Sequence, residues 1–145
     1  MTVKIKDLMS KSVVTAQPHQ TVGQLRTKMG KRKLNSVPVV SVDNEPVGVV
    51  SATDLVAADK EGTPISNIMT EKVYTIPDYE NVSVAARMMR NHNIHHLVVT
   101  KEKELIGVIS SYDLLKLVEG RRFEMKNAST PRKKAKGKRA KAELG

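Results

Sequence analysis

The amino-acid sequence predicts an α+β fold of two small modules, each with the element order β-α-β-β-α, followed by a basic tail. Three observations support this prediction. The chain repeats itself at a spacing of about sixty residues. Within each copy, short β-branched runs alternate with stretches of helical periodicity. Residues 121–145 hold almost no large apolar side chain, yet they carry ten of the 25 Lys and Arg residues.

The repeat consists of ordered matches rather than of one shared dipeptide. Residues 5–10 (IKDLMS) return as 65–70 (ISNIMT), and residues 48–54 (GVVSATD) return as 107–113 (GVISSYD). The offset falls from sixty to fifty-nine between these matches, so the second copy has lost one turn residue.

The matches divide the chain into a first module at residues 1–62, a second module at 63–120 and the tail at 121–145. One module has three short strands and is too small to bury a good core alone. We therefore expect the two modules to pack through their sheets with pseudo-twofold symmetry. The interface between them is then the natural concave surface for a small ligand.

Each module is expected to open with a short helix that carries Met9 or Met69, and to close with a helix that begins near Ser51 or Ser110. A strand, an amphipathic helix and two strands joined by a tight turn lie between these helices. In the first module they are expected at residues 13–15, 21–33, 37–40 and 47–50. In the second module they are expected at residues 73–76, 81–93, 97–100 and 105–109. The apolar helix faces comprise Val22, Leu25 and Met29, and in the second copy Val82, Ala85, Ala86 and Met89.

Composition excludes several kinds of protein and site. The chain has no cysteine, which excludes disulfides and thiolate zinc sites. Residues 1–12 lack the apolar run of a signal peptide, and the longest apolar stretches have strand length. We therefore expect no membrane span and a cytoplasmic location. Because no Gly-x-Ser-x-Gly motif, P-loop or cysteine nucleophile is present, we do not expect an enzyme.

The duplicated pattern closely resembles the CBS domain family over roughly residues 3–119. The resemblance is carried by the Asp-Leu-Met-Ser and Asn-Ile-Met-Thr openings, the Val-Pro-Val-Val strand and two Gly-h-h-Ser-x-x-Asp motifs, where h is apolar. It implies a pair of CBS domains, a Bateman module, of the stand-alone regulatory type. It implies AMP, ADP, ATP or S-adenosylmethionine as the regulatory ligand, with no cofactor required. It also implies a homodimer, since CBS pairs often associate into flat dimers.

In this family the Asp of the repeated motif commonly binds the ribose hydroxyls, and the Ser commonly reaches a phosphate. The resemblance assigns these roles to Asp54 and Asp113 and to Ser51 and Ser110. The chemistry agrees, because a carboxylate suits two adjacent hydroxyl donors and a helix N-terminus presents N–H groups to an anion. The resemblance places adenine against the first two strands, at Thr15, Ala16, Pro38, Thr75, Ile76 and Val98.

The sequence departs from the family at the phosphate site. Many nucleotide-binding members carry Arg before the Asp, whereas this chain has Thr53 and Tyr112. His95 and His96 match the family's phosphate-contacting pair and partly compensate for the missing Arg. The same positions in the first copy hold the neutral residues Asn35 and Ser36, so we expect the two half-sites to differ.

Several residues also have simpler interpretations. Both Ser-x-x-Asp motifs fit a helix capping box, and capping and ligand binding are compatible. His92, with the two histidines that follow, forms a weak metal motif, so we expect no metal site. Tyr74 and Tyr112 are candidates for base stacking, although burial between the modules is the simpler expectation. Gly48 and Gly107 are expected to let the strand end close to a ligand.

The tail carries +8 of the net charge of +10. We expect it to be disordered on its own, either as a solubilising segment or as an electrostatic tether to nucleic acid or an acidic protein. Two functional hypotheses follow: a non-catalytic adenosine-ligand sensor, and a nucleic-acid-associated protein whose CBS pair is a dimerisation scaffold. In the second hypothesis the phosphate-contacting cations are Arg132, Lys133, Lys134, Lys136, Lys138, Arg139 and Lys141.

Overall fold

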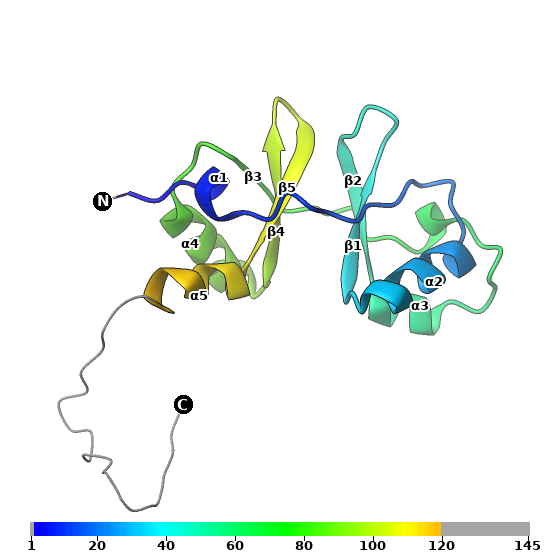
Figure 1. Cartoon of the computed structure of the whole chain (residues 1–145). Helices are drawn as coiled ribbons and strands as arrows, with labels where there is room; N and C mark the ends of the chain where they lie inside the picture. Colours follow the sequence, from blue (N-terminus) through cyan, green and yellow to red (C-terminus); the bar gives the residue numbers. More distant parts are fainter. Residues whose placement is uncertain (1, 120–145) are drawn as a thin grey trace, which may run out of the picture.

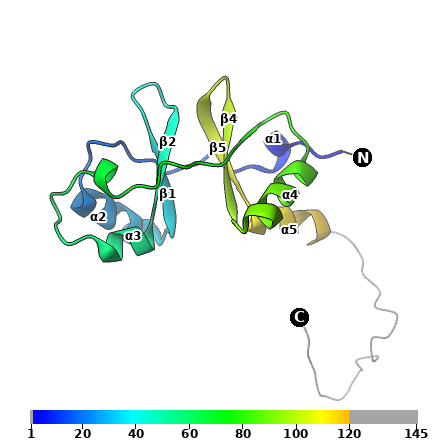
Figure 2. The ribbon, with the colours of Figure 1, turned by 180° about the vertical axis from the view of Figure 1, so that it is seen from behind.

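The computed structural model describes residues 2–119, and the predicted tail at 121–145 lies outside them. Two modules lie side by side, with their sheets facing each other and their helices on the outer sides (Figure 1). The view from behind shows the same arrangement, in which the second module repeats the first about a pseudo-twofold axis (Figure 2). The predicted α+β fold of two modules packed through their sheets is therefore confirmed.

From the amphipathic helix onward, the elements follow the predicted order in both modules, and the second module also has the predicted first strand. The first module contains α2 (Val22–Arg32), β1 (Ser36–Val40), β2 (Pro46–Ser51) and α3 (Ala52–Ala57). The second contains β3 (Thr75–Pro77), α4 (Val82–His92), β4 (His96–Lys101), β5 (Glu104–Ser110) and α5 (Ser111–Glu119). The strands β1 and β2 form an antiparallel hairpin, as do β4 and β5, while β3 runs parallel to β4. None of the helices within residues 2–119 combines the length and hydrophobicity needed to cross a membrane.

The predicted apolar helix faces cover the sheets, with one exception. The residues predicted for α2 are all buried, as are Ala85 and Met89 of α4, and Val82 is partly buried. Ala86 is exposed, whereas Val84 and Met88 pack against the core, so the apolar face of α4 is shifted from the predicted one. Each module thus has its own small core of aliphatic side chains between helices and sheet.

The predicted first strand of the first module is reduced to a single bridge between Ala16 and Val39. The two copies differ here because proline has no N–H to donate. In the second module Val98 N donates to Tyr74 O at 3.1 Å, and Asp78 N donates to Thr100 O at 3.2 Å. The corresponding donors in the first copy are replaced by two prolines, Pro38 and Pro18. The prediction of a strand at residues 13–15 was therefore wrong.

The two short opening helices are exchanged between the modules. The helix α1 (Ile5–Leu8) packs into the core of the second module, where Ile5 is fully buried. The 3-10 helix η1 (Ile65–Asn67) packs into the core of the first module through Ile65. Backbone bonds hold both helices: Ile5 N donates to Glu80 O at 2.8 Å, and Ile65 N donates to Gln20 O at 2.7 Å. The core of each module therefore contains a short helix that, in the sequence, comes just before the other module.

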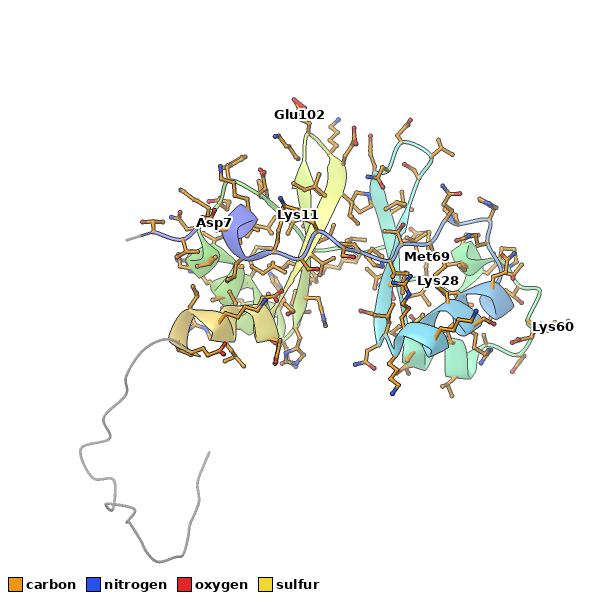
Figure 3. The ribbon with its side chains drawn as sticks, viewed as in Figure 1. Asp7, Lys11, Lys28, Lys60, Met69 and Glu102 are labelled. Carbon is orange, nitrogen blue, oxygen red and sulfur yellow. The ribbon has the colours of Figure 1, made fainter. Side chains whose placement is uncertain are left out.

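A glycine in each sheet makes room for this exchange. A Cβ atom on Gly48 would lie 2.6 Å from Met69 Sδ, and a Cβ atom on Gly107 would lie 2.8 Å from both Met9 Sδ and Ser10 O. Figure 3 shows Met69 beside the β1–β2 hairpin. These glycines thus admit the crossing segments, and the expectation that they make room for a ligand was wrong.

The contact between the modules consists of a small apolar cluster and one pair of hydrogen bonds. Val40, Val98 and Leu105 are buried together between the facing sheets, with the linker residues Val13 and Val73 packed against them. At the hairpin end, the Asn44 side chain donates to Leu105 O, and Leu105 N donates back to Asn44 O, both at 2.9 Å. These bonds fix the hairpin of one module to a strand of the other.

Candidate functional site

A cleft of about 930 Å³ lies between the modules. It opens where β2 and β5 end and where α3 and α5 begin, which is the lower side of the molecule in Figure 1. The two linkers that cross between the modules also line it, through Ser10, residues 12–14, Thr70 and residues 72–74. Figures 1 and 2 show that these linkers pass on opposite sides of the molecule. The cleft is therefore enclosed by both modules and both crossing segments.

Both Ser-x-x-Asp motifs line this cleft, and both form capping boxes. Ser51 N donates to Asp54 Oδ2 at 2.8 Å, and Asp54 N donates to Ser51 Oγ at 3.1 Å. Ser110 and Asp113 repeat this geometry at 2.9 and 3.1 Å. Each motif therefore fixes the first turn of its helix and holds a carboxylate at the cleft.

The two carboxylates differ in their second oxygen. Asp113 Oδ1 lies 3.3 Å from Lys116 Nζ, and only 13% of the Asp113 side chain is exposed. The first module has Ala57 at the position of Lys116. Within residues 2–119 no ion pair involves Asp54. Asp54 is consequently the carboxylate better placed to accept hydrogen bonds from a ligand.

The histidines predicted at the phosphate site lie at the start of β4 and line the cleft. His96 pairs with Ser110 across the sheet, and His95 O accepts a bond from Ser111 N at 2.9 Å. Partial burial lowers the pKa of His96, His95 lowers it further, and Asp113 acts in the opposite direction. His96 is therefore predominantly neutral at pH 7, and an anionic ligand would favour its protonated form.

The neutral pair in the first module has the same geometry. Asn35 O accepts a bond from Ala52 N at 2.8 Å, as His95 O does in the second module, and Ser36 pairs with Ser51. At these positions the backbones match and the side chains do not, so the two halves of the cleft present different side-chain chemistry.

Eight of the twelve residues predicted to bind the ligand line the cleft: Pro38, Ser51, Asp54, His95, His96, Val98, Ser110 and Asp113. The four residues predicted on the first strands do not. Ala16 and Ile76 belong to the module cores and are only 2% and 1% exposed. Thr15 and Thr75 also lie outside the cleft lining, and Thr15 O accepts a bond from Lys28 Nζ. The structure therefore places none of these four residues in the cleft lining, where a base could contact them.

The residues just before them line the cleft instead: Val13, Val14, Val73 and Tyr74. Sequence reasoning missed them, because their place in the linkers leads to the cleft only when the opening helices are exchanged, and the sequence does not show this exchange. Tyr74 packs against His92, with ring centroids 4.5 Å apart, and Lys72 Nζ lies 5.3 Å from the Tyr74 ring centroid. Tyr112 is 74% exposed, so the expectation of burial between the modules was wrong for this residue.

No cluster of three or more His, Cys, Asp or Glu side chains within residues 2–119 has the arrangement of a metal site. His92 contacts Tyr74, while the two following histidines line the cleft. The cleft lining therefore combines two acids, two lysines, hydroxyls and imidazoles with apolar side chains, which suits a small polar molecule with one flat apolar part.

Comparison with known proteins identifies the fold. The CBS domain family model matches residues 5–61 and 65–120. The crystal structure of the CBS domain pair of protein MJ0100, in complex with 5'-methylthioadenosine and S-adenosyl-L-methionine, superposes with a TM-score of 0.73 at 26% identity. The match covers 84% of this chain and all of that one.

Sequence relatives show the same module in two settings. L-aspartate semialdehyde sulfurtransferase of Methanosarcina acetivorans is 31% identical over 120 residues, which are 81% of this chain but 24% of that protein. Protein YlbB of Bacillus subtilis is 32% identical over 117 residues, 77% of this chain and 79% of that one. The chain thus spans about a quarter of the enzyme and most of the shorter relative. Taken with the duplicated fold and the family match, this places the chain in the CBS domain family, as a pair of CBS domains.

Proposed function

We propose that the chain is a non-catalytic regulatory module that binds an adenosine-type ligand in the cleft between its two CBS domains. The observation that carries the proposal is the convergence of both Ser-x-x-Asp motifs on one cleft of about 930 Å³. Two segments fifty-nine residues apart in the sequence place the same acceptor and hydroxyl groups there. A cleft of this size accommodates a nucleotide.

The cleft offers a partner for each part of such a ligand. Asp54 accepts hydrogen bonds from the ribose hydroxyls, since its second oxygen is outside any ion pair of residues 2–119. Pro38 and Val98 line the cleft between the polar groups and provide apolar contact for a flat base. His95, His96 and Ser110 receive a phosphate. AMP, ADP and ATP supply all three parts, and S-adenosylmethionine supplies the first two.

Similarity supports the ligand class. The CBS pair of MJ0100 holds two adenosine derivatives, and 84% of this chain superposes on the whole of that pair. The sulfurtransferase supports a regulatory role, because the matched region is a minor part of that enzyme. We infer that the CBS pair regulates a catalytic activity that lies outside the pair itself. We also infer that this chain works in the cytoplasm and requires no cofactor.

In this proposal, ligand binding acts on the packing of the two modules through the linkers. The linkers that line the cleft continue into α1 and η1, which complete the opposite modules. A ligand that contacts both linkers therefore fixes the relative position of the modules. The read-out partner in this proposal is a second copy of the chain.

The surface for that second copy is the apolar face of α5 with the matching face of α3. Tyr112, Leu115 and Val118 recur on α5 at helical spacing and are exposed, and Val56 occupies the position of Leu115 in the first module. Apolar side chains grouped in this way mark protein–protein contacts. A dimer through these helices leaves the hairpin ends of both sheets exposed.

A thermal-shift screen tests the proposal with AMP, ADP, ATP, 5'-methylthioadenosine and S-adenosylmethionine. A ligand that binds only the folded state raises the melting temperature. We expect at least one of these ligands to do so, and Asp54→Asn to remove the rise while leaving the unliganded protein folded. Asp43→Asn, an exposed acid on the first hairpin, is the matched control and should behave as wild type. No shift with any of the five ligands would reject the proposal.

The charge of residues 121–145 favours a second candidate function, binding to nucleic acid or to an acidic protein through the tail, with the CBS pair as scaffold. Truncation after Gly120 tests it. The candidate requires that the full chain bind duplex DNA or RNA in a salt-sensitive way and that the truncated chain lose this binding. Equal behaviour of the two forms at low salt would reject it.

A further inference from the structure

We propose that the cleft selects phosphorylated adenosines, and that Lys33 and Lys72 supply the phosphate-binding charge. The inference rests on the proposed function and narrows its ligand class. Neither Ser-x-x-Asp motif contains Lys or Arg, since Thr53 and Tyr112 precede the two Asp residues, so the motifs themselves contribute no cation. Both lysines line the cleft, each from a different element.

Lys33 is held in an unusual backbone conformation. It is the C-cap of α2, with φ 54° and ψ 46° in the left-handed region. The equivalent cap of α4 is Asn93, with φ 54° and ψ 48°. Asn adopts this conformation more readily than Lys, so local stability alone favours the residue that the second copy carries. At this position the first copy instead has Lys33, whose side chain brings an ammonium group to the cleft lining.

Lys72 is placed by the linker that crosses the cleft. It follows Thr70, which pairs with Val49, and its Nζ lies 5.3 Å from the centroid of the Tyr74 ring. Contact with an aromatic face orients an ammonium group and leaves its donors available to an anion. The first linker has Ser12 at this position. Both cations thus replace neutral residues of the other copy.

The charges that remain in the cleft favour an anion. The lysines and carboxylates of the lining are Lys33, Lys72, Asp54 and Asp113. Asp113 is paired with Lys116, while neither cleft lysine belongs to an ion pair among residues 2–119. Asp54 is occupied by the ribose in the proposed complex. The cleft therefore offers a phosphate two ammonium groups that belong to no ion pair of residues 2–119. S-adenosylmethionine carries one carboxylate against two cationic groups, the sulfonium and the amino group, so its net positive charge is disfavoured beside these lysines.

Isothermal titration with AMP, adenosine and S-adenosylmethionine tests this inference. We expect wild type to bind AMP at least tenfold more tightly than either of the other two ligands. Lys33→Asn and Lys72→Ser, which copy the other module, should each weaken AMP binding by about tenfold, the factor equivalent to about 1.4 kcal/mol. Adenosine binding should not change. Lys33→Asn should also keep or raise the melting temperature, which separates loss of affinity from loss of structure.

Lys31→Asn is the matched control, because Lys31 lies at the same helix end but outside the cleft lining. It should bind AMP as wild type does. Equal affinities of wild type for AMP and adenosine would overturn the inference and leave the proposed function standing. Undiminished AMP binding by both cleft variants, or tighter binding of S-adenosylmethionine, would do the same. Absence of binding by all three ligands would overturn the inference, and the five-ligand thermal-shift screen then decides the proposed function separately.

Discussion

At the residue scale, the side chains of Asp54 and Asp113 each have two roles, one in capping a helix and one in lining the cleft. One carboxylate oxygen accepts the N–H of the preceding serine and fixes the first turn of a helix. The same side chain lines the cleft between the modules. The sequence predicted both the cap and the cleft position, because a Ser-x-x-Asp motif at a strand-to-helix junction fixes local geometry. It did not predict that Asp113 would be paired with Lys116, which depends on a helical neighbour outside the motif.

Substitution of Asp54 separates the two tasks. Asp54→Ala removes the capping acceptor and should lower the free energy of unfolding by about 1 kcal/mol. Asp54→Asn retains an acceptor oxygen and should stay near wild type in stability. Both variants should lose adenosine-ligand affinity, since neither offers a carboxylate to the ribose. Urea unfolding together with ligand titration measures the two effects, and full ligand affinity in Asp54→Asn would exclude Asp54 as the ribose acceptor.

Stability should depend on pH through His96. Its pKa in the folded state lies below the ordinary value of 6.5, mainly because of partial burial. The unfolded chain therefore binds a proton more readily, so the folded state loses stability as pH falls below about 6.5. The loss should be smaller in His96→Gln, which has no titrating group there. An NMR titration giving His96 a pKa at or above 6.5 would contradict this account.

At the scale of elements, the exchanged opening helices shape the cleft. Because α1 and η1 pack into opposite modules, the segments after them must cross the interface, and they become cleft lining. The sequence showed the openings as parts of the repeat but carried no signal of which module each would join. For the same reason the sequence predicted cleft positions for Thr15, Ala16, Thr75 and Ile76, whereas the cleft lining contains the linker residues just before them. The effect of Pro18 and Pro38 on the first strand was, by contrast, readable from residue chemistry.

The glycines at the crossings provide a test of the exchange. Gly107→Ala would place a Cβ atom 2.8 Å from Ser10 O and Met9 Sδ, and should lower the free energy of unfolding by about 1–3 kcal/mol through overpacking. Gly30→Ala is the control, because a Cβ atom there meets nothing within 4 Å. Gly30 is helical, so its replacement should raise stability by about 0.5–1 kcal/mol. Equal effects of the two substitutions would show that the crossing segment does not lie against β5.

At the scale of the whole molecule, two cores are joined by a small apolar contact and enclose one cleft. This architecture followed from the sequence, because each copy alone is too small for a good core and the repeat implies symmetry. The asymmetry of the cleft was predictable at His95 and His96 but not at Lys33 and Lys72, which lie outside the repeated motifs.

The apolar face of α5 gives a prediction about assembly. Leu115 is 59% exposed among other apolar side chains, so Leu115→Glu should convert the proposed dimer to a monomer. Val42→Glu is the control, because Val42 is 90% exposed on the first hairpin, away from the helices. Sedimentation velocity distinguishes the two states. A monomeric wild type, or a dimer that persists in Leu115→Glu, would exclude this surface as the dimer contact.

The central claim is that an adenosine ligand occupies the space between the modules, and amide NMR of the isotope-labelled chain titrated with AMP tests it most directly. The account predicts saturable shift changes at Ser51, Asp54, His96 and Ser110, with the outer helix faces and Val42 unaffected. Saturable changes confined to those outer surfaces, or no changes at millimolar AMP, would contradict it.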